Sequence, residues 1–173
     1  KSRWAYTFQN CAVLSRYQSI ETAIAEHQCH EHQCHEHHHH EGDKRQVFIT
    51  ERCLSSDHEV FAKMLHHDRK IDTLEYALYQ KWLDQLLKSS TTLGAVIHVN
   101  TPADICAARV KSRHRGGEED IPLEYLKAVG QYQQAWVDGL AQTLPGCPVH
   151  TTGYTPIDSV AEVEEFVRSL QSL

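Results

Sequence analysis

This sequence has no apolar run that approaches the roughly 20 residues a membrane-spanning helix needs, and its first ten residues hold no apolar signal segment. It has no C-x-x-C pair among its six cysteines, unlike the disulfide frameworks of small secreted proteins. Positive charge is not in excess either, since 17 Lys and Arg stand against 23 Asp and Glu. These absences argue against a membrane partner and against nucleic-acid binding through bulk charge, and they predict an intracellular protein.

The sequence does contain an alternation of short apolar runs and amphipathic helices. Its 173 residues are enough for one domain with a core, so we expect 1–173 to form a single domain. Strands are predicted at 47–49, 94–99 and 147–151. Helices are predicted at 3–26, after the possible caps Ser55, Ser56 and Asp57, at 72–88, near 105–110, from Pro122 to Leu140, and from Pro156 or Asp158 to 170. This alternation predicts an α/β fold with a parallel sheet flanked by helices.

A biased segment interrupts the pattern at residues 27–43. HQCHE occurs twice in tandem, at 27–31 and 32–36, and HHHHEGD follows. Because His and Cys are ligands for zinc, nickel or copper, a metal-binding module is one interpretation. However, the five-residue period keeps no single helix face and fits no zinc-finger spacing. We therefore interpret the segment as a solvated loop inserted between the first helix and the first strand.

Charged residues follow the first predicted strand directly. Glu51 and Arg52 stand at its C-terminal end, and Asp57 stands at the start of the next helix. Ligands bind at the carboxyl ends of strands in open parallel sheets, so we expect these three residues to face one crevice. A surface ion pair is the alternative. Gln9 and Arg16 lie two turns apart on the first helix, on a side that faces either solvent or a pocket.

A second charged group lies further along the chain. Arg109 and Arg113 share a helix face, where like charges repel unless an anion lies between them. Arg115, the pair Gly116–Gly117 and Glu118 follow. Since Arg suits bidentate phosphate binding and glycine gives a flexible joint, this pattern predicts a lid that closes over phosphates. The alternative is a solvated helix end whose cations are favoured by the helix dipole.

Four stretches together resemble the deoxyribonucleoside kinase family, in order and in spacing apart from the His-rich insertion. They are WAYTFQNCAVLSR at 4–16, ITERCLSSDHEVFAK at 49–63, EYALYQKWLD at 75–84 and RVKSRHRGGEEDIPLEYL at 109–126. Each stretch alone is weak, but the set is specific and covers the chain from Trp4 to about Trp136. The resemblance is to the deoxycytidine and deoxyguanosine kinase-like branch. It implies a P-loop-kinase-like three-layer sandwich and, in nucleotide salvage, phosphoryl transfer from ATP to the 5′-hydroxyl of a deoxynucleoside.

The resemblance also implies roles for residues at the phosphate end of the site. Glu51 would help to hold Mg²⁺, and Arg52 would contact the phosphates and the reacting oxygen. The family's Glu-Arg-Ser reads Glu-Arg-Cys here, with Cys53 in the third place. The lid arginines would be Arg109, Arg113 and Arg115. ATP and Mg²⁺ are thus the implied cofactors, and positioning with charge neutralisation is the implied mechanism.

At the nucleoside end, the resemblance implies a pocket for the base and a contact for the sugar. Phe8 would stack near the base, and the Gln9 amide would pair with the base edge. Arg16 and Asp57 would complete the pocket and favour deoxycytidine, deoxyadenosine or deoxyguanosine over thymidine. Glu118 would accept the sugar 3′-hydroxyl.

One family motif has no counterpart in this chain. The family begins with a strand, a P-loop G-x-x-x-x-G-K-[ST] and a Glu that serves as general base. This sequence contains no such P-loop, and its Gly pair, Gly116–Gly117, is not followed by Lys. We therefore expect a fragment that lacks the first strand and the P-loop and is inactive by itself. A non-catalytic dimerising relative is an alternative, as is the metal-binding module. For the homodimer that the family implies, the sequence offers an apolar surface at Val60, Phe61, Met64 and Leu65.

Overall fold

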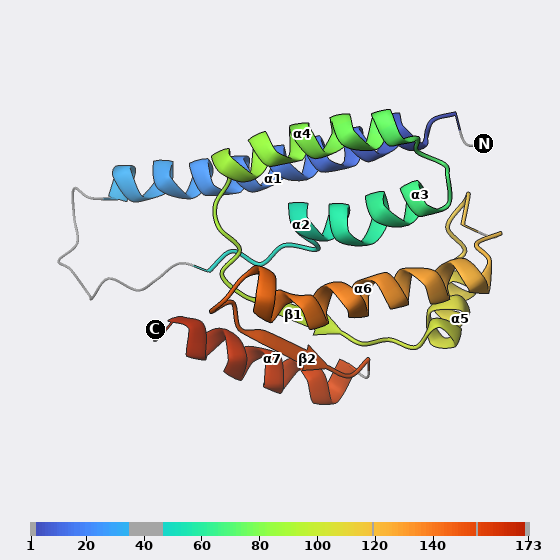
Figure 1. Ribbon diagram of the computed structural model, residues 1–173. Helices are drawn as coiled ribbons and strands as arrows, with labels where there is room; N and C mark the ends of the chain where they lie inside the picture. The colour runs from blue at the N-terminus through green and yellow to red at the C-terminus, as the bar shows by residue number, and fades with distance from the viewer. Residues whose placement is uncertain (1–2, 35–46, 119, 155, 172–173) are drawn as a thin grey trace.

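The computed structural model describes residues 3–34, 47–118, 120–154 and 156–171. Its elements follow one another in the order α1 (Ala5–Cys34), α2 (Leu54–Ser56), η1 (Asp57–Ala62), α3 (Lys63–His67), α4 (Thr73–Ser89), β1 (Val96–Val99), α5 (Ala103–Arg113), α6 (Leu123–Thr143), β2 (Val149–Thr152) and α7 (Pro156–Gln171). Helices α1 and α4 lie side by side on one side of the molecule (Figure 1). The run α2–η1–α3 packs between that pair and α6, and α7 packs on β2 at the opposite side. None of the described helices is long and apolar enough to cross a membrane.

The sheet is parallel, as the alternation of strands and helices predicts. Strand β1 pairs with β2, with Val96 opposite Val149 and Val99 opposite Thr152. The α/β class and the predicted strands at 94–99 and 147–151 are therefore confirmed, although both strands are four residues long. In the described part of the chain the sheet has two strands.

The predicted strand at 47–49 is wrong. Residues 47–50 have no regular secondary structure, and Phe48 and Ile49 are exposed by 45% and 68%. An apolar run becomes a buried strand only where a neighbouring strand satisfies its backbone groups. Among the described residues, β1 and β2 pair with each other and neither pairs with this run.

Helix α4 starts where the sequence predicts, whereas α2 does not start at its predicted caps. Asp72 caps α4, accepting from the Glu75 amide at 2.8 Å while the Glu75 carboxylate accepts from the Asp72 amide at 2.9 Å. At α2, however, the N-cap is Cys53 rather than Ser55, Ser56 or Asp57. The three predicted residues lie inside the helical run because the chain already turns at Cys53, which brings Asp57 into η1.

Helix α1 is longer than predicted, and the expectation of a loop from residue 27 is wrong as far as Cys34. The first HQCHE copy and part of the second continue the helix because neither contains a glycine or proline to stop it. The rest of the insertion, residues 35–43, lies outside the described residues.

The core joins α1, the α2–η1 run and α4. Val13, Leu54, Ala62, Tyr79 and Leu83 form its buried cluster. Val60 and Met64 are also buried, with exposed fractions of 2% and 1%. The surface predicted for dimerisation is therefore wrong at these two residues, because their side of η1 and α3 faces the protein interior.

Candidate functional site

Asp57 occupies the centre of the candidate site, at the first position of η1. This element is a π-helix, in which the amide of Lys63 donates to the carbonyl of His58 five residues earlier. Single π-helical turns inside α-helices occur frequently at functional sites. Asp57 is 2% exposed, so its carboxylate needs partners from neighbouring elements.

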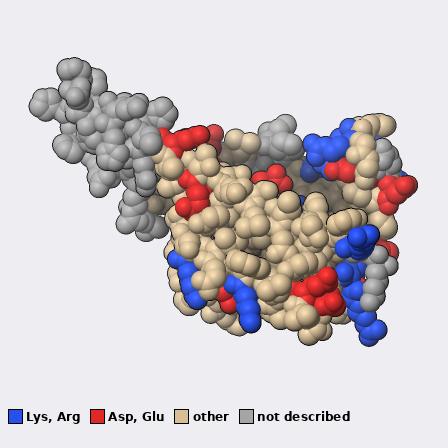
Figure 2. All heavy atoms as spheres, turned by 90° about the horizontal axis from the view of Figure 1, so that it is seen from above, with Lys and Arg blue, Asp and Glu red and all other residues tan. Residues whose placement is uncertain are grey.

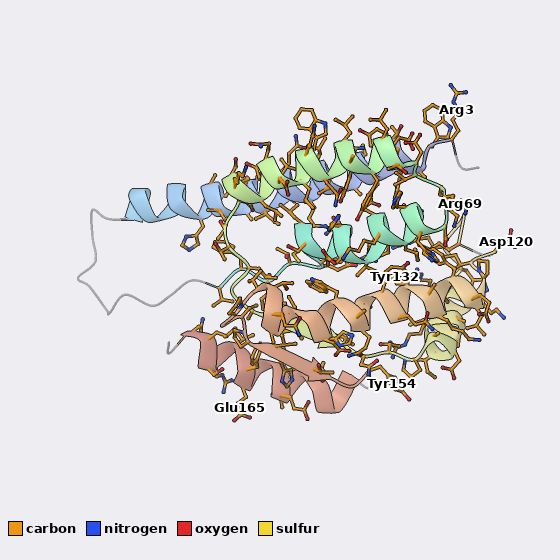
Figure 3. The ribbon with its side chains drawn as sticks, in the orientation of Figure 1. Arg3, Arg69, Asp120, Tyr132, Tyr154 and Glu165 are labelled. Atoms are coloured by element: carbon orange, nitrogen blue, oxygen red, sulfur yellow. The ribbon has the colours of Figure 1, made fainter. Side chains whose placement is uncertain are left out.

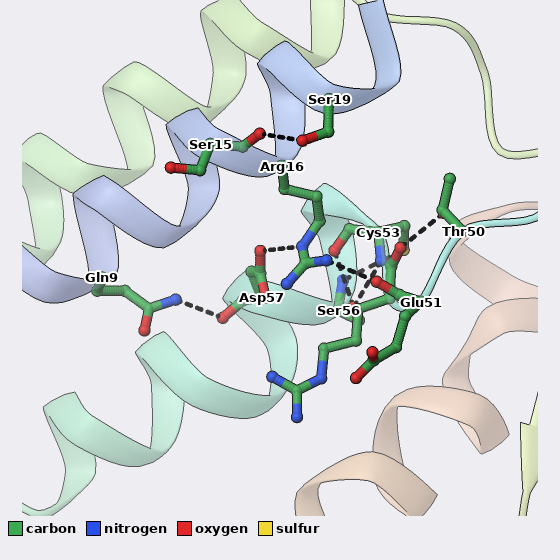
Figure 4. Close-up of polar contacts among 10 residues, drawn as sticks. Gln9, Ser15, Arg16, Ser19, Thr50, Glu51, Cys53, Ser56 and Asp57 are labelled. Atoms are coloured by element: carbon green, nitrogen blue, oxygen red, sulfur yellow. Dashed lines mark hydrogen bonds and ion pairs between the residues drawn. The ribbon is translucent and has the colours of Figure 1, made fainter. Parts of the chain in front are cut away.

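Helix α1 supplies those partners (Figure 4). The Arg16 Nε donates to Asp57 Oδ2 at 2.7 Å. The Gln9 Nε2 donates to the Asp57 carbonyl oxygen at 3.1 Å, and Gln9 itself is 3% exposed. Gln9 and Arg16, which the resemblance assigns with Asp57 to one base pocket, thus both contact Asp57, although it lies more than 40 positions further along the chain.

Arg16 also reaches the segment that carries the predicted catalytic residues. Its Nη1 donates to the Glu51 carbonyl oxygen at 2.5 Å. The Glu51 and Arg52 side chains are exposed, and Arg52 has a positive φ of 67°. For a residue with a Cβ, this left-handed conformation costs about 1–2 kcal/mol. One guanidinium therefore joins the predicted base pocket to a strained turn that bears Glu51 and Arg52.

Beneath this network lie Tyr79 and His58, which sequence reasoning missed. Tyr79 is fully buried, and burial raises the pKa of its hydroxyl to about 12. The His58 Nε2 lies 2.9 Å from the Tyr76 hydroxyl, and its Nδ1 lies 3.0 Å from the Glu59 carboxylate. Burial lowers the pKa of His58, so the neutral ring is favoured. The apolar i, i+4 row of α4, which includes Leu74, Leu78 and Trp82, is exposed, and the buried side of the helix carries Tyr79 instead, so the spacing gave no sign that Tyr79 faces Gln9 and Asp57.

The predicted lid arginines do not converge on one point in this structure. The Arg109 Nη2 donates to the Tyr154 carbonyl at 2.8 Å, in the segment after β2 (Figure 3). The Arg113 Nε donates to the Glu118 carboxylate at 2.8 Å, and Arg115 lies 3.7 Å from the same carboxylate. The turn between them needs glycine at Gly117, whose φ is +87°. Glu118 thus lies next to two arginines, and Arg109 is held elsewhere.

Two surface hollows lie beside these groups, and neither coincides with the whole predicted site. One has a volume of about 580 Å³ and lies between η1 and α4, lined in part by Ser55, His58 and Glu59. The other, of about 240 Å³, is at the end of α5 and includes Arg115. Phe8 is 69% exposed on α1. Among the described residues, no group of three or more His, Cys, Asp or Glu side chains is placed to hold a metal ion.

Comparison with known proteins places this chain in a family. The family model for deoxynucleoside kinases matches residues 1–172 of the chain. The chain belongs to the deoxynucleoside kinase family. The resemblance seen in the four sequence stretches is therefore confirmed, and the parallel α/β fold agrees with the P-loop-kinase-like fold that the family implies.

Relatives in the family carry several substrate names. The chain is 34% identical to deoxycytidine kinase 2 of Gallus gallus over 139 residues, which are 79% of this chain and 48% of that protein. It is 28% identical to the mitochondrial deoxyguanosine kinase of Xenopus laevis over 142 residues, 78% of this chain and 48% of the relative. It is 26% identical to the mitochondrial thymidine kinase 2 of Macaca fascicularis over 137 residues, which are 79% of this chain and 44% of that protein. The chain thus spans about half the length of the curated relatives it matches.

Proposed function

We propose that this chain forms the nucleoside-binding part of a kinase that transfers a phosphoryl group from ATP to the 5′-hydroxyl of a deoxynucleoside. The observation that carries the proposal is the buried network in which Gln9 and Arg16 of α1 meet Asp57 of η1. Such a network is preorganised, because its side chains are fixed by one another before any ligand arrives. Arg16 extends it to the Glu51 carbonyl, which brings the turn with Glu51 and Arg52 next to the base pocket.

The residues fit a magnesium–ATP complex as the cofactor. Mg²⁺ in kinases is usually held by one or two carboxylates together with the phosphates of the nucleotide, and not by a cage of protein ligands. Glu51 offers one exposed carboxylate, and Arg52 beside it offers a cation for the phosphates. Arg109, Arg113 and Arg115 would place positive charge close to the negative charge that develops on the transferred phosphoryl group. When bound, the metal neutralises phosphate charge, while these side chains orient the nucleotide.

We further propose that the base pocket favours an amino-bearing base over thymine. Gln9 uses its Nε2 on the Asp57 carbonyl, so the amide oxygen is the group that it offers to a base amino group. The Arg16–Asp57 pair fills the region near Gln9, where a thymine 5-methyl group would have to fit. Exchanging Arg16→Met together with Asp57→Ala opens this region and should raise kcat/KM for thymidine relative to deoxycytidine. Each single exchange should raise this ratio less than the double exchange does, because it leaves one charge of the pair without its partner.

The test compares the 173-residue chain with a chimera. In the chimera, the chain follows the segment that precedes the matched region in the Gallus gallus relative. The chain contains no G-x-x-x-x-G-K-[ST] loop to cradle phosphates, so we expect negligible phosphorylation by the chain alone and measurable phosphorylation of deoxycytidine by the chimera. Robust turnover by the chain alone contradicts our assignment of the phosphate site. A folded chimera that binds no deoxynucleoside in calorimetry contradicts the assignment of the base pocket.

We propose that the protein is a homodimer and that α4 provides the contact. Leu74, Leu78 and Trp82 form a row at i, i+4 and i+8, with exposed fractions of 79%, 44% and 56%. Figure 2 looks onto the side of α1 and α4 and shows a broad central area with few charged side chains. A contiguous row of large, exposed apolar side chains is typical of a protein–protein contact surface.

Sedimentation at micromolar concentration tests this contact. Trp82→Glu should give monomers, whereas Gln80→Glu, at an exposed position of α4 outside the row, should leave the dimer intact. A monomeric parent, or a dimeric Trp82→Glu variant, contradicts the assignment.

We also place the protein inside the cell, in the cytoplasm or in mitochondria, because two of the relatives above carry the word mitochondrial in their names.

A further inference from the structure

The turn Thr50–Glu51–Arg52 is held in an unusual shape by a residue to which neither the fold nor the family resemblance assigns a role. Arg52 has φ 67°, which side chains with a Cβ rarely adopt. The Thr50 Oγ1 donates to the Arg52 carbonyl oxygen at 2.8 Å, so the hydroxyl closes the turn across Glu51 (Figure 4). Hydroxyl groups make such short-range bonds to the backbone in turns.

Two further contacts hold the same turn from other elements. The Arg16 Nη1 of α1 donates to the Glu51 carbonyl, as described above. The Arg52 guanidinium carbon lies 4.4 Å from the centre of the Phe61 ring of η1, within the range of a cation–π contact. The carbonyls of both Glu51 and Arg52 are therefore fixed, and the Arg52 side chain is directed over Phe61.

Thr50 makes no other side-chain hydrogen bond within the described part of the chain. Its side chain is exposed and is not part of the buried core cluster. Its bond to the Arg52 carbonyl is the contact that makes it specific, because valine has the same shape and could occupy the position equally well without the hydroxyl. A residue with a purely structural role would act through packing, which Thr→Val preserves.

We propose that Thr50 is a positioning residue that keeps Arg52 in the left-handed conformation and thereby places its guanidinium over Phe61. Arg16 completes the arrangement by joining the same turn to the base pocket at Asp57. The part of this inference that concerns catalysis rests on the proposed function, in which Arg52 contacts phosphates. The part that concerns the shape of the turn does not.

The first experiment tests the shape by NMR on the 173-residue chain labelled at arginine. A positive φ gives a strong NOE between the amide proton and the Hα of the same residue. A guanidinium group over an aromatic ring gives ring-current shifts of the arginine Hδ protons next to it. Thr50→Val should lose both signals at Arg52, and Thr50→Ser, which restores the hydroxyl, should keep both. The matched control is Thr143→Val, which removes a hydroxyl bond to the Gly139 carbonyl in α6 and should change neither signal.

Unchanged Arg52 signals in a folded Thr50→Val variant overturn the proposal. If valine is not accommodated, Thr50→Ala removes the same hydroxyl and serves in its place. Loss of the signals in Thr50→Ser as well also overturns it, because the hydroxyl would then not be the cause.

The second experiment measures kinetics in the chimera described above. Displacing a positioned group should lower kcat by about 10-fold or more while KM for the deoxynucleoside changes little, because the base pocket is untouched. Thr50→Ser should recover most of the rate. If the NMR signals respond as expected but the parent chimera shows no kinase activity, the positioning role stands and the proposed function fails. If the parent is active and Thr50→Val matches it in kcat, the catalytic part of the inference is overturned.

Discussion

The two ends of the candidate site hold their arginines in different ways. At the α1–η1 end, Arg16 is mostly buried and contacts Asp57, which is 2% exposed. At the α5 end, Arg113 and Arg115 are more than half exposed and share one carboxylate, that of Glu118. Arg109, on the same helix, contacts Tyr154 instead. The first arrangement is a fixed network between elements, and the second is a set of local pairs at a helix end.

In the proposed function, this contrast separates base recognition from charge neutralisation. A buried pair keeps its geometry because breaking it leaves a charge without water, whereas exposed pairs exchange partners at little cost. The α1–η1 end can therefore define the shape of a base pocket in advance. The α5 end can exchange its internal partners for phosphates, as the proposed lid requires.

The largest effect should come from breaking the Arg16–Asp57 pair. Arg16→Met strands a fully buried carboxylate and should lower the free energy of unfolding by about 3–5 kcal/mol. Asp57→Ala strands a guanidinium that keeps some water and the Glu51 carbonyl, so its cost should be smaller, about 1–3 kcal/mol. The double exchange should cost less than the sum of the two. Chemical denaturation of all four proteins checks this.

The control for that cycle is an exposed pair on the terminal helix. Arg168 lies 3.2 Å from Glu164, with both side chains more than half exposed. Arg168→Met should change stability by less than about 1 kcal/mol. Equal costs at Arg16 and Arg168, or strict additivity of the Arg16 and Asp57 exchanges, would show that the two ends of the site do not differ as described.

A second effect on the η1 side depends on pH. Burial lowers the pKa of His58, while Glu59 and Asp84 oppose that shift and Lys63 adds to it. The folded state then binds fewer protons than the unfolded state, whose His has the ordinary pKa of 6.5. Stability from this group is thus complete above pH 6.5 and is lost as the pH falls toward the lowered value in the folded protein. Melting temperatures between pH 8 and 5 should fall less steeply in His58→Gln than in the parent, and parallel curves would contradict this.

The exposed end should respond differently, with little change in stability. Glu118→Gln removes the partner of Arg113 and Arg115, yet exposed pairs contribute less than about 1 kcal/mol. Its main effect should be a higher affinity for pyrophosphate, measured by calorimetry, since two guanidinium groups lose their internal competitor. Glu124→Gln, which breaks the exposed pair with Lys127, is the control and should leave pyrophosphate binding unchanged. Weaker binding in Glu118→Gln would mean that Glu118 positions the arginines.

The sequence predicted the parts of this fold that depend on local signals. The limits of α4 depend on such signals, and the helix begins and ends within one residue of its prediction, whereas its apolar row Leu74, Leu78 and Trp82 is exposed rather than buried. The run at Val47–Ile49 has equally good local signals, but whether a strand forms depends on a neighbour elsewhere in the chain. For the site, the resemblance named Gln9, Arg16 and Asp57 as one group. It could not show that Arg16 also contacts the Glu51 carbonyl, because that bond depends on the backbone and not on a residue type.

The smallest predicted effect concerns a weak point in the otherwise fixed α1–η1 end. Cys53 caps the helix that carries Asp57, and its Sγ accepts from the Ser56 amide at 3.4 Å, while the Ser56 Oγ accepts from the Cys53 amide at 3.0 Å. Sulfur is a weak acceptor and serine is a preferred N-cap, so Cys53→Ser should strengthen the cap. Burial raises the pKa of the Cys53 thiol, which keeps it protonated and limits what it can accept.

Serine also loses some apolar contact at this half-buried position, which offsets part of the gain, so the net increase in the free energy of unfolding should be only about 0.5 kcal/mol. Cys11→Ser, at an exposed position of α1, is the matched control and should change nothing measurable in denaturant. A less stable Cys53→Ser protein would mean that packing of the sulfur outweighs the cap. The N-terminus of the α2–η1 run would then be held by its burial against the core, and the precision of Asp57 would depend on α1 alone.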